Sequence, residues 1–233
     1  MTSIDPFIAE LLAEGEISVT GRLVDASNAS LYADVSLGDA SRKIIYKPIA
    51  GERPLWDFPD GTLADREVAA YKLSEALGLH VVPHTILRDG PYGLGMVQLW
   101  IEQDEDFDLL AFAQSRDERL RAMVIFDAII NNTDRKFGHI LLDGANLLGC
   151  DHGVTFHEEP KLRTVLWQFC GEEFSPSDCT IVERAAALDF SFIADHITES
   201  EIVALQERIG ELLESGRFPM PSDEWPAVPW PPF

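Results

Sequence analysis

The chain has 233 residues, and 46% of them are hydrophobic, so it can form one large domain or two small lobes around a substantial core. Its 40 acidic and 18 basic side chains give a formal net charge of -22, which argues against nucleic acids and anionic membranes as partners, because phosphate groups bind clustered cations. Strong acidity is also what solubility in a salty or crowded cytoplasm requires, and it leaves room for a small cationic phosphate pocket.

Cysteine usage and the start of the chain indicate a reduced, cytoplasmic protein. The three cysteines, at positions 150, 170 and 179, have no metal-binding spacing, and an odd number argues against a disulfide framework. Residues 1–13 lack the cationic start and the long apolar core of a secretory signal. No apolar run approaches the roughly 20 residues of a membrane helix, so we expect no stable membrane association.

The first half of the chain has the pattern of an antiparallel sheet with two helices. Alternating apolar residues and intervening turns predict five strands, over residues 16–25, 31–37, 43–48, 80–87 and 94–101. A short helix is expected at 4–13 and a longer one at 63–77. The longer helix would be capped by Thr62 and closed by Gly78.

An acidic segment, 102–108, is expected to link this half to a mainly helical one. Periodicity there predicts strands at 140–142 and 147–150, and helices at 109–114, 118–130, 177–188 and 199–215. This order favours an α+β, two-lobed, protein-kinase-like fold. Its small antiparallel N-lobe, with an ATP-binding sheet and one helix, would cover 1–101, and its mainly helical C-lobe 102–233.

The last stretch, 219–233, contains six prolines, which rule out a helix because proline lacks the backbone donor and clashes with the preceding turn. We expect an extended strap whose Trp225, Trp230 and Phe233 pack on the body. The alternative is a disordered segment whose proline and tryptophan residues bind a protein partner.

A polar loop between two apolar segments carries the strongest functional signal. In "FDAIINNTDRKFGHILLD" an apolar helix gives way to Asp134, Arg135 and Lys136, and Asp151 follows 17 positions after Asp134. Two carboxylates at the ends of a small hairpin can converge on one point, where they would hold a metal ion or orient an acceptor hydroxyl. Each also has a structural reading, as a turn cap for Asp134 and as a loop salt bridge for Asp151.

Two motifs, "NNTDRKFGHILL" (131–142) and "LLGCDHGVTF" (147–156), resemble the catalytic and metal-binding loops of the phosphatidylinositol 3- and 4-kinase-like superfamily. The resemblance is closest to type II phosphatidylinositol 4-kinases and bacterial toxin-type kinases, in the form of a small kinase-like protein of actinobacterial type. The stretch "REVAAYKLSEALGLHVVPHT" (66–85) resembles the Glu-bearing helix and following strand of the same branch. The similarity spans about residues 17–156, with the motifs in the family's order.

The resemblance implies an ATP site with a divalent metal ion. Lys47, in "IIYKP", would hold the phosphates, and Glu67 would be its ion-pair partner, with Glu75 as the less favoured alternative. Asp134 would orient the acceptor hydroxyl, and Asp151 would bind Mg²⁺ or Mn²⁺ through oxygen. Without the resemblance, Lys47 reads as a solvated edge charge and Glu67 as an exposed helical charge.

The resemblance also implies where ATP would bind. The small-residue turn "ASNAS" stands in the place of a glycine-rich loop, and its phosphate donors would be Ser27, Asn28 and Ser30. The strand "GMVQLW" leads into the hinge, and its adenine contacts would come from Met96, Gln98, Leu99 and Trp100. A bare hairpin turn and a buried core strand are the alternatives for these two segments.

One position departs from the family pattern. His139 stands five residues after Asp134, where the family has an Asn that serves as the second metal ligand. Imidazole is a poorer ligand for Mg²⁺ than for Mn²⁺, so His139 implies Mn²⁺ preference, a single metal, a phosphate contact or lost activity. His152, which replaces a Phe-type residue beside Asp151, is open to a site role or to a hydrogen-bonded structural one.

The function predicted is ATP-dependent phosphoryl transfer to a hydroxyl of a protein or of a small soluble polyol, with autophosphorylation included. Lys161 and Arg163 are candidates for contacting an anionic acceptor, unless they are ordinary solvated charges. Two alternatives stay open. One is a nucleotide-binding pseudokinase that acts through partners, which the His139 substitution favours, and the other is nucleotidyl transfer to protein side chains with ATP bound in reverse.

Overall fold

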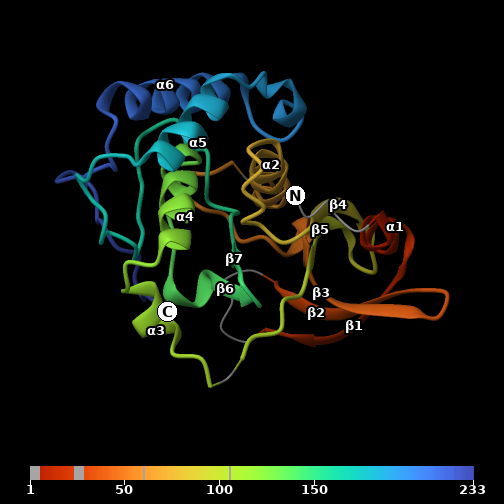
Figure 1. The fold of residues 1–233 in the computed structure, drawn as a ribbon. Helices are drawn as coiled ribbons and strands as arrows, with labels where there is room; N and C mark the ends of the chain where they lie inside the picture. Colours follow the sequence, from red (N-terminus) through yellow and green to blue (C-terminus); the bar gives the residue numbers. More distant parts are fainter. Residues whose placement is uncertain (1–5, 24–28, 60, 105) are drawn as a thin grey trace.

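A five-stranded antiparallel sheet and a helical half make up the protein (Figure 1). The structure is a computed structural model that describes residues 6–23, 29–59, 61–104 and 106–233. The strands of the sheet lie in the order β1-β2-β3-β5-β4 and precede Trp100 in the chain, whereas most of the helices follow it. The α+β arrangement expected from the sequence is therefore confirmed.

The strands of the sheet are β1 (Glu16–Arg22), β2 (Leu31–Leu37), β3 (Ala40–Pro48), β4 (Thr85–Gly90) and β5 (Gly93–Leu99). Apolar residues alternate along β2, and its inner face packs on helix α1 (Pro6–Glu14) through contacts that bury Leu11 and Val35. Lys47, near the end of β3, lies opposite Met96 on β5. β3 is the middle strand of the sheet and pairs with β2 on one side and β5 on the other. Lys47 therefore lies within the sheet and not at its edge.

β4 begins later than the sequence predicted. The expected strand started at residue 80, but His80 has a positive φ of 51° and Pro83 has no backbone donor, so strand pairing begins only at Thr85. The predicted end of the first strand, at residues 24 and 25, lies outside the described residues. The other expected strands agree with the structure to within a few residues at each end.

Helix α2 (Leu63–Ala76) lies between the sheet and the helical half (Figure 1). Its start is where the sequence predicted it, but the side chain of Thr62 accepts from none of the first helical amides and instead donates to the carbonyl of Pro59 at 2.8 Å. The carboxylate of Glu52 accepts from the first two helical amides instead, at 3.2 and 2.9 Å. Gly78, with a φ of 65°, ends the helical segment as predicted.

The helical half contains the hairpin β6-β7 (Ile140–Asp143 and Asn146–Gly149) and the helices α3 (Leu109–Ala113), α4 (Glu118–Ile129), α5 (Pro176–Ala186) and α6 (Glu199–Ser215). Short 3-10 helices cover Ile49–Gly51, Phe137–His139 and Phe190–Ile193. α4 is largely buried, since α5 and α6 pack against it (Figure 1). Among the described residues, no helix has both the length and the apolar character that crossing a bilayer requires.

Helices α5 and α6 begin in the same way. Each starts with a capping box, formed by Ser175 with Asp178 in α5 and by Thr198 with Glu201 in α6. In each box the acid accepts from the backbone amide of the cap residue, at 2.8 Å in both helices. Both acids also pair with an arginine of another helix, so each helix start is tied to its surroundings by one carboxylate.

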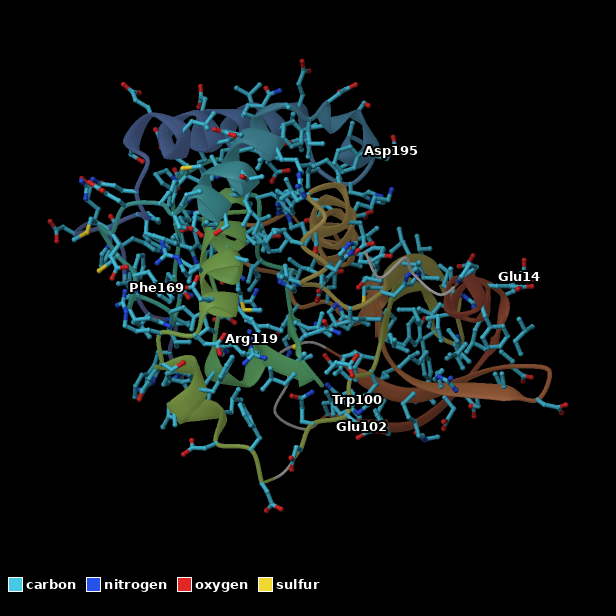
Figure 2. The ribbon with its side chains drawn as sticks, in the orientation of Figure 1. Glu14, Trp100, Glu102, Arg119, Phe169 and Asp195 are labelled. Atoms are coloured by element: carbon cyan, nitrogen blue, oxygen red, sulfur yellow. The ribbon has the colours of Figure 1, made fainter. Side chains whose placement is uncertain are left out.

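The chain crosses from the sheet to the helical half after Trp100. Figure 2 labels Trp100 and Glu102 at this crossing. The Trp100 amide donates to the carbonyl of Lys43 at 3.0 Å, and its ring packs edge-on against Tyr32 at 5.1 Å. These two contacts hold the start of the crossing against β2 and β3.

The C-terminal segment forms an extended strap across the helical half, as predicted. Its carbonyl at Ala227 accepts a hydrogen bond from the amide of Thr164 at 3.0 Å. Its carbonyl at Pro232 accepts one from the amide of Phe137 at 2.9 Å. Backbone hydrogen bonds thus fasten the strap at two separate places on the body.

Two of the three aromatic residues of the strap contact the body as predicted. Trp225 covers the ammonium of Lys161, which lies 5.1 Å from its ring centroid. Phe233 is 63% exposed but still contacts an aromatic ring of the body, at 5.0 Å between the centroids. The prediction for Trp230 is wrong, because its side chain is 88% exposed. The neighbouring Pro229 is buried instead, so the strap turns Trp230 toward solvent.

Replacing Trp225 by Ala should lower the free energy of unfolding by about 2 kcal/mol, because it uncovers a buried ammonium and removes aromatic packing. Trp230→Ala is the matched control and should change that free energy by less than about 0.5 kcal/mol, since its side chain faces solvent. Urea denaturation followed by circular dichroism measures both variants. Equal losses in the two would contradict the packing of the strap.

Candidate active site

A buried arginine organises the polar loop that follows α4. Arg135 has no exposed surface, and its guanidinium donates to the two carboxylate oxygens of Asp127 on α4, at 2.8 and 2.9 Å. The same guanidinium donates to the carbonyls of His139 and Cys150, each at 3.2 Å. One charged group therefore joins the helix, the loop and the end of the β6-β7 hairpin, which explains why charged residues interrupt two apolar segments.

Asn132 and His152 complete this network. The side-chain amide of Asn132 donates to Asp127 at 2.9 Å, and its carbonyl oxygen accepts the backbone amide of Asp134 at 3.0 Å. His152 Nε2 lies 2.8 Å from the guanidinium of Arg135, and burial together with that positive charge holds the pKa of His152 well below its ordinary value. His152 is therefore a neutral hydrogen-bond acceptor, so its structural reading applies.

Asp134, His139 and Asp151 converge on one point, with one possible ligand atom of each within 4.8 Å of the others. His139 Nε2 is 3.3 Å from Asp151 Oδ2, close to the roughly 3 Å between two ligands at right angles around an ion about 2.1 Å away. His139 Nδ1 is buried without a hydrogen-bond partner among the described residues. Burial also lowers the pKa of His139, which leaves a neutral ring able to bind a cation. Two carboxylates and an imidazole fit a divalent cation, and Mn²⁺ better than Mg²⁺.

Lys47 stands between two carboxylates. Its Nζ lies 2.7 Å from Glu67 on α2 and 2.7 Å from Asp151, so the sheet, α2 and the helical half meet at this ammonium. The second oxygen of Glu67 accepts the backbone amide of His152 at 2.9 Å. Glu75, the alternative partner, pairs with a histidine of the following loop at 2.8 Å. The structure thus brings Lys47, Glu67 and Asp151 together and leaves Glu75 apart.

The charges at this site act on one another. Burial opposes the charge on Lys47, but the carboxylates of Asp151 and Glu67 outweigh it and raise the pKa of Lys47. Lys47 in turn holds the pKa of Asp151 well below its usual range, and the Asp151 side chain is 48% exposed. Burial raises the pKa of Asp134, although Lys136 at 3.2 Å opposes this. Asp151 is therefore ionised, as a metal ligand has to be, while Asp134 is the better proton acceptor.

A small cavity of about 20 Å³ opens beside Lys47. From the turn that the sequence indicated as a phosphate loop, Ala29 lines this cavity. The structure does not support Ser30 as a phosphate donor, because its side chain is only 3% exposed and does not line the cavity. The predictions for Ser27 and Asn28 lie outside the described residues.

In the strand predicted to contact adenine, most groups are already used in core packing and hydrogen bonds within the protein. Met96 is fully buried, and the buried side chain of Gln98 donates to a threonine hydroxyl at 2.8 Å. The amides of Leu99 and Trp100 donate to carbonyls of the flanking segments at 2.9 and 3.0 Å. These two amides are therefore not open to an adenine edge, because the protein already satisfies them. The next amide, of Ile101, has no acceptor in the described parts of the chain.

Lys161 is not available to an anionic acceptor, so that prediction is wrong. Its side chain is buried between two tryptophan rings, at 4.8 and 5.1 Å, and pairs with Asp57 at 3.3 Å. Arg163 donates from Nε to the carbonyl of Thr133 at 2.7 Å. This contact supports the backbone one residue before Asp134.

Comparison with curated proteins places the chain in a family. The chain is 41% identical over 267 aligned positions to Protein Rv2133c of Mycobacterium tuberculosis (strain ATCC 25618 / H37Rv), and the match covers 96% of this chain and 94% of that protein. The chain belongs to the family of Protein Rv2133c. No protein-family model matches it.

Solved kinase structures share the fold. The structure of the Golgi casein kinase with Mn and ADP bound matches with a TM-score of 0.61 and 12% identity, over 92% of this chain and 76% of that one. The proinflammatory kinase CtkA of Helicobacter pylori matches with a TM-score of 0.54 and 14% identity, over 89% of this chain and 94% of that one. The kinase-like fold predicted from the sequence is therefore confirmed.

Several residues of the site were missed by sequence reasoning. Asp127 carried a visible signal, since a carboxylate within an apolar helix needs a buried partner. Arg135, which the sequence presents only as a neighbour of Asp134, is that partner. Glu52, which lines the cavity beside Lys47, had no signal in the sequence, because its role depends on where the loop before α2 lies.

Asp127→Asn should lower the free energy of unfolding by roughly 3–5 kcal/mol, because it leaves the guanidinium of Arg135 buried without its carboxylate. Asp117→Asn is a matched control, since Asp117 also forms a two-point pair with an arginine, but at the surface. Its loss should stay below about 1 kcal/mol. Chemical denaturation compares the two variants, and similar losses would show that the buried pair does not hold the loop.

Proposed function

We propose that this protein is an ATP-dependent kinase that transfers a phosphoryl group to a hydroxyl of a protein, itself included, or of a small soluble polyol. The observation that carries the proposal is the meeting of Lys47 with Glu67 and Asp151, at 2.7 Å each, beside a cluster able to hold a cation. Phosphoryl transfer needs a cation on the phosphates, an acid that positions it and acids for the metal. The Golgi casein kinase neighbour, solved with Mn and ADP, supports a nucleotide and a divalent cation.

Each residue would have a separate task. Lys47 would contact the phosphates of ATP, while Glu67 keeps its ammonium in place. Asp151 and His139 would hold Mg²⁺ or Mn²⁺, which supplies charge neutralisation at the transferred phosphoryl group when bound. Asp134, whose pKa is raised by burial, would orient the acceptor hydroxyl and accept its proton.

The nucleotide would bind between an N-lobe at 1–101 and a C-lobe at 102–233. We assign both lobes to the phosphatidylinositol 3-/4-kinase-like superfamily, because the catalytic and metal motifs resemble it in order and spacing. The open amide of Ile101 makes the start of the crossing the candidate contact for the adenine edge. We propose a cytoplasmic location, and the net charge of -22 favours a protein or polyol hydroxyl over one on an anionic membrane.

Two other functions remain as alternatives. His139, in the place of an Asn ligand, favours a pseudokinase that binds nucleotide and acts through a partner, for which the exposed Trp230 of the strap is a candidate contact. The second alternative is nucleotidyl transfer, which would use the same site residues with ATP bound in the reverse orientation. Intact-mass measurement of the product separates the two transfer reactions, because phosphate and AMP add different masses.

Asp134→Asn and Asp151→Asn should each lower the rate of ATP turnover or label transfer by roughly 100-fold or more, because one loses the proton acceptor and the other a metal ligand. Asp143→Asn is the control, as an exposed acid on the same hairpin, and should keep the wild-type rate. Purified protein with labelled ATP and either Mg²⁺ or Mn²⁺ supplies the assay. Unchanged turnover in both site variants would refute the assignment, and nucleotide binding without turnover in the wild type would favour the pseudokinase.

His139→Asn should shift metal preference from Mn²⁺ toward Mg²⁺, because an amide oxygen suits Mg²⁺ better than imidazole does. The ratio of the Mn²⁺-supported rate to the Mg²⁺-supported rate measures this, and it should fall by several-fold or more. An unchanged ratio would mean that His139 is not a metal ligand.

A further inference from the structure

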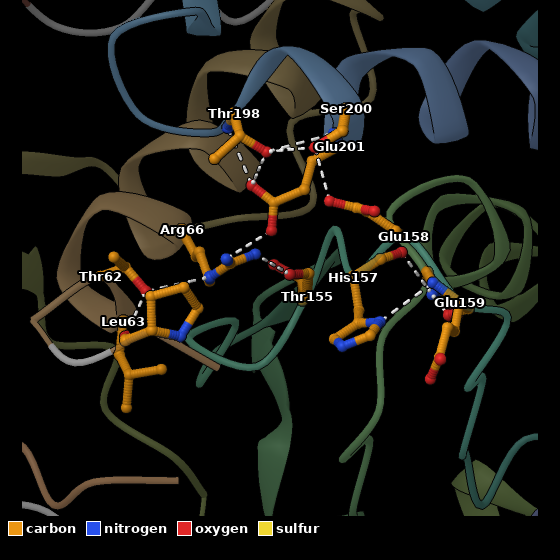
Figure 3. Close-up of polar contacts among 12 residues, drawn as sticks. Thr62, Leu63, Arg66, Thr155, His157, Glu158, Glu159, Thr198, Ser200 and Glu201 are labelled. Atoms are coloured by element: carbon orange, nitrogen blue, oxygen red, sulfur yellow. Dashed lines mark hydrogen bonds and ion pairs between the residues drawn. The ribbon is translucent and has the colours of Figure 1, made fainter. Parts of the chain in front are cut away.

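Two neighbouring residues of α2 contact different parts of the molecule. Glu67 faces Lys47 and the candidate site, whereas Arg66 faces the helical half, because successive residues of a helix point about 100° apart. Figure 3 shows Arg66 reaching Glu201 at the start of α6 and Thr155 in the segment after Asp151. Any shift of α2 that moved Glu67 away from Lys47 would therefore also move Arg66.

Arg66 is held firmly. Its side chain is 2% exposed, and its guanidinium lies 2.5 Å from the carboxylate of Glu201 and 2.6 Å from the carbonyl of Thr155. The ring of Phe58 lies 4.8 Å from the guanidinium carbon. A guanidinium that lost these partners without reaching water would be left as an uncompensated buried charge. The position of α2 in which Arg66 reaches Glu201 and Thr155, called the docked position below, is therefore strongly favoured over one in which these contacts are broken.

The partners of Arg66 are themselves fixed. The second oxygen of Glu201 accepts from the amide and the hydroxyl of Thr198, at 2.8 and 3.1 Å, within the capping box of α6. Thr155 donates from its hydroxyl to the carbonyl of His152, which is the residue after Asp151. Arg66 thus sets α2 against both the start of α6 and the segment that carries Asp151.

Other polar contacts join α2 to the helical half along its length. Asp65 lies 2.7 Å from His196, and Lys72 lies 2.8 Å from the other nitrogen of the same ring. Beyond the end of the helix, the carbonyl of Leu77 accepts from Arg184. Helix α2 is therefore anchored to the helical half near both ends, and it also packs against β4 and β5 of the sheet.

We propose that Arg66 and Glu201 are positioning residues, which keep α2 docked so that the Glu67–Lys47 pair is assembled before any nucleotide binds. The catalytic consequence rests on the proposed kinase function, whereas the docking of α2 does not. A site assembled in advance binds its ligand without the loss of affinity that a rarely populated competent state would impose. Weakening the anchor should then raise the KM for ATP while leaving kcat nearly unchanged, because saturating ATP restores the docked state.

The test compares Glu201→Gln with Asp178→Asn. Both acids belong to capping boxes and both pair with an arginine, but Asp178 pairs with Arg121 of α4 and does not contact α2. In Glu201→Gln without nucleotide, we expect hydrogen exchange of the α2 amides to speed up by about tenfold or more, the factor for one weakened charged hydrogen bond. The KM for ATP should rise several-fold. In Asp178→Asn, α2 exchange and KM should match the wild type.

Arg66→Lys keeps the charge but loses the fork that reaches two acceptors, so it should act in the same direction. This variant decides the question if Glu201→Gln fails to fold. Exchange of α2 that is equal in the Glu201 and Asp178 variants would overturn the proposal. So would a fall in kcat at unchanged KM. If the wild type neither binds nor turns over ATP, the proposed function fails, and the exchange data still decide whether Arg66 and Glu201 hold α2.

Discussion

A guanidinium that is cut off from water has to find acceptors inside the protein, and Arg135 is such a group. It gathers the carboxylate of Asp127, the carbonyls of His139 and Cys150 and the ring of His152 around itself. These contacts set the polar loop against α4 and against the end of the β6-β7 hairpin. Because Asp134 lies just before Arg135 and Asp151 just after Cys150, satisfying one buried charge also brings the two acids of the candidate site together.

The second constraint is the charge balance at that site. In a chain with a net charge of -22, a nucleotide triphosphate needs local positive charge. Lys47 supplies an ammonium, but Glu67 and Asp151 already pair with it, and Asp134 lies close by with its own lysine. Carboxylates outnumber ammonium groups here, so the proposed ATP would need a divalent cation as well, for which Asp151 and His139 are the proposed ligands.

Helix α2 connects these two constraints. Its Glu67 fixes Lys47 of the sheet, and its Arg66 fixes the helix against α6 and the segment after Asp151 (Figure 3). A further oxygen of Glu67 accepts the amide of His152, which belongs to the Arg135 network. The sheet, α2 and the loops of the candidate site are therefore joined by a continuous set of hydrogen bonds among buried or partly buried polar and charged groups. Such a set is sensitive to the removal of any one partner, because the remaining charge has no solvent to compensate it.

The sequence by itself determined the order of elements and the start of α2 at Leu63, since periodicity and turn residues are local signals. The acids that meet near Lys47 were indicated by the resemblance of two motifs to a kinase family, and not by periodicity. Contacts between distant segments were decided only by the tertiary structure. Glu52 rather than Thr62 accepts the first amides of α2, and Trp230 points to solvent although Trp225 is packed. The physical reason is that a hydrogen-bonding group or an aromatic ring specifies what it needs, whereas the partner that meets the need is whichever segment the folded chain brings within reach.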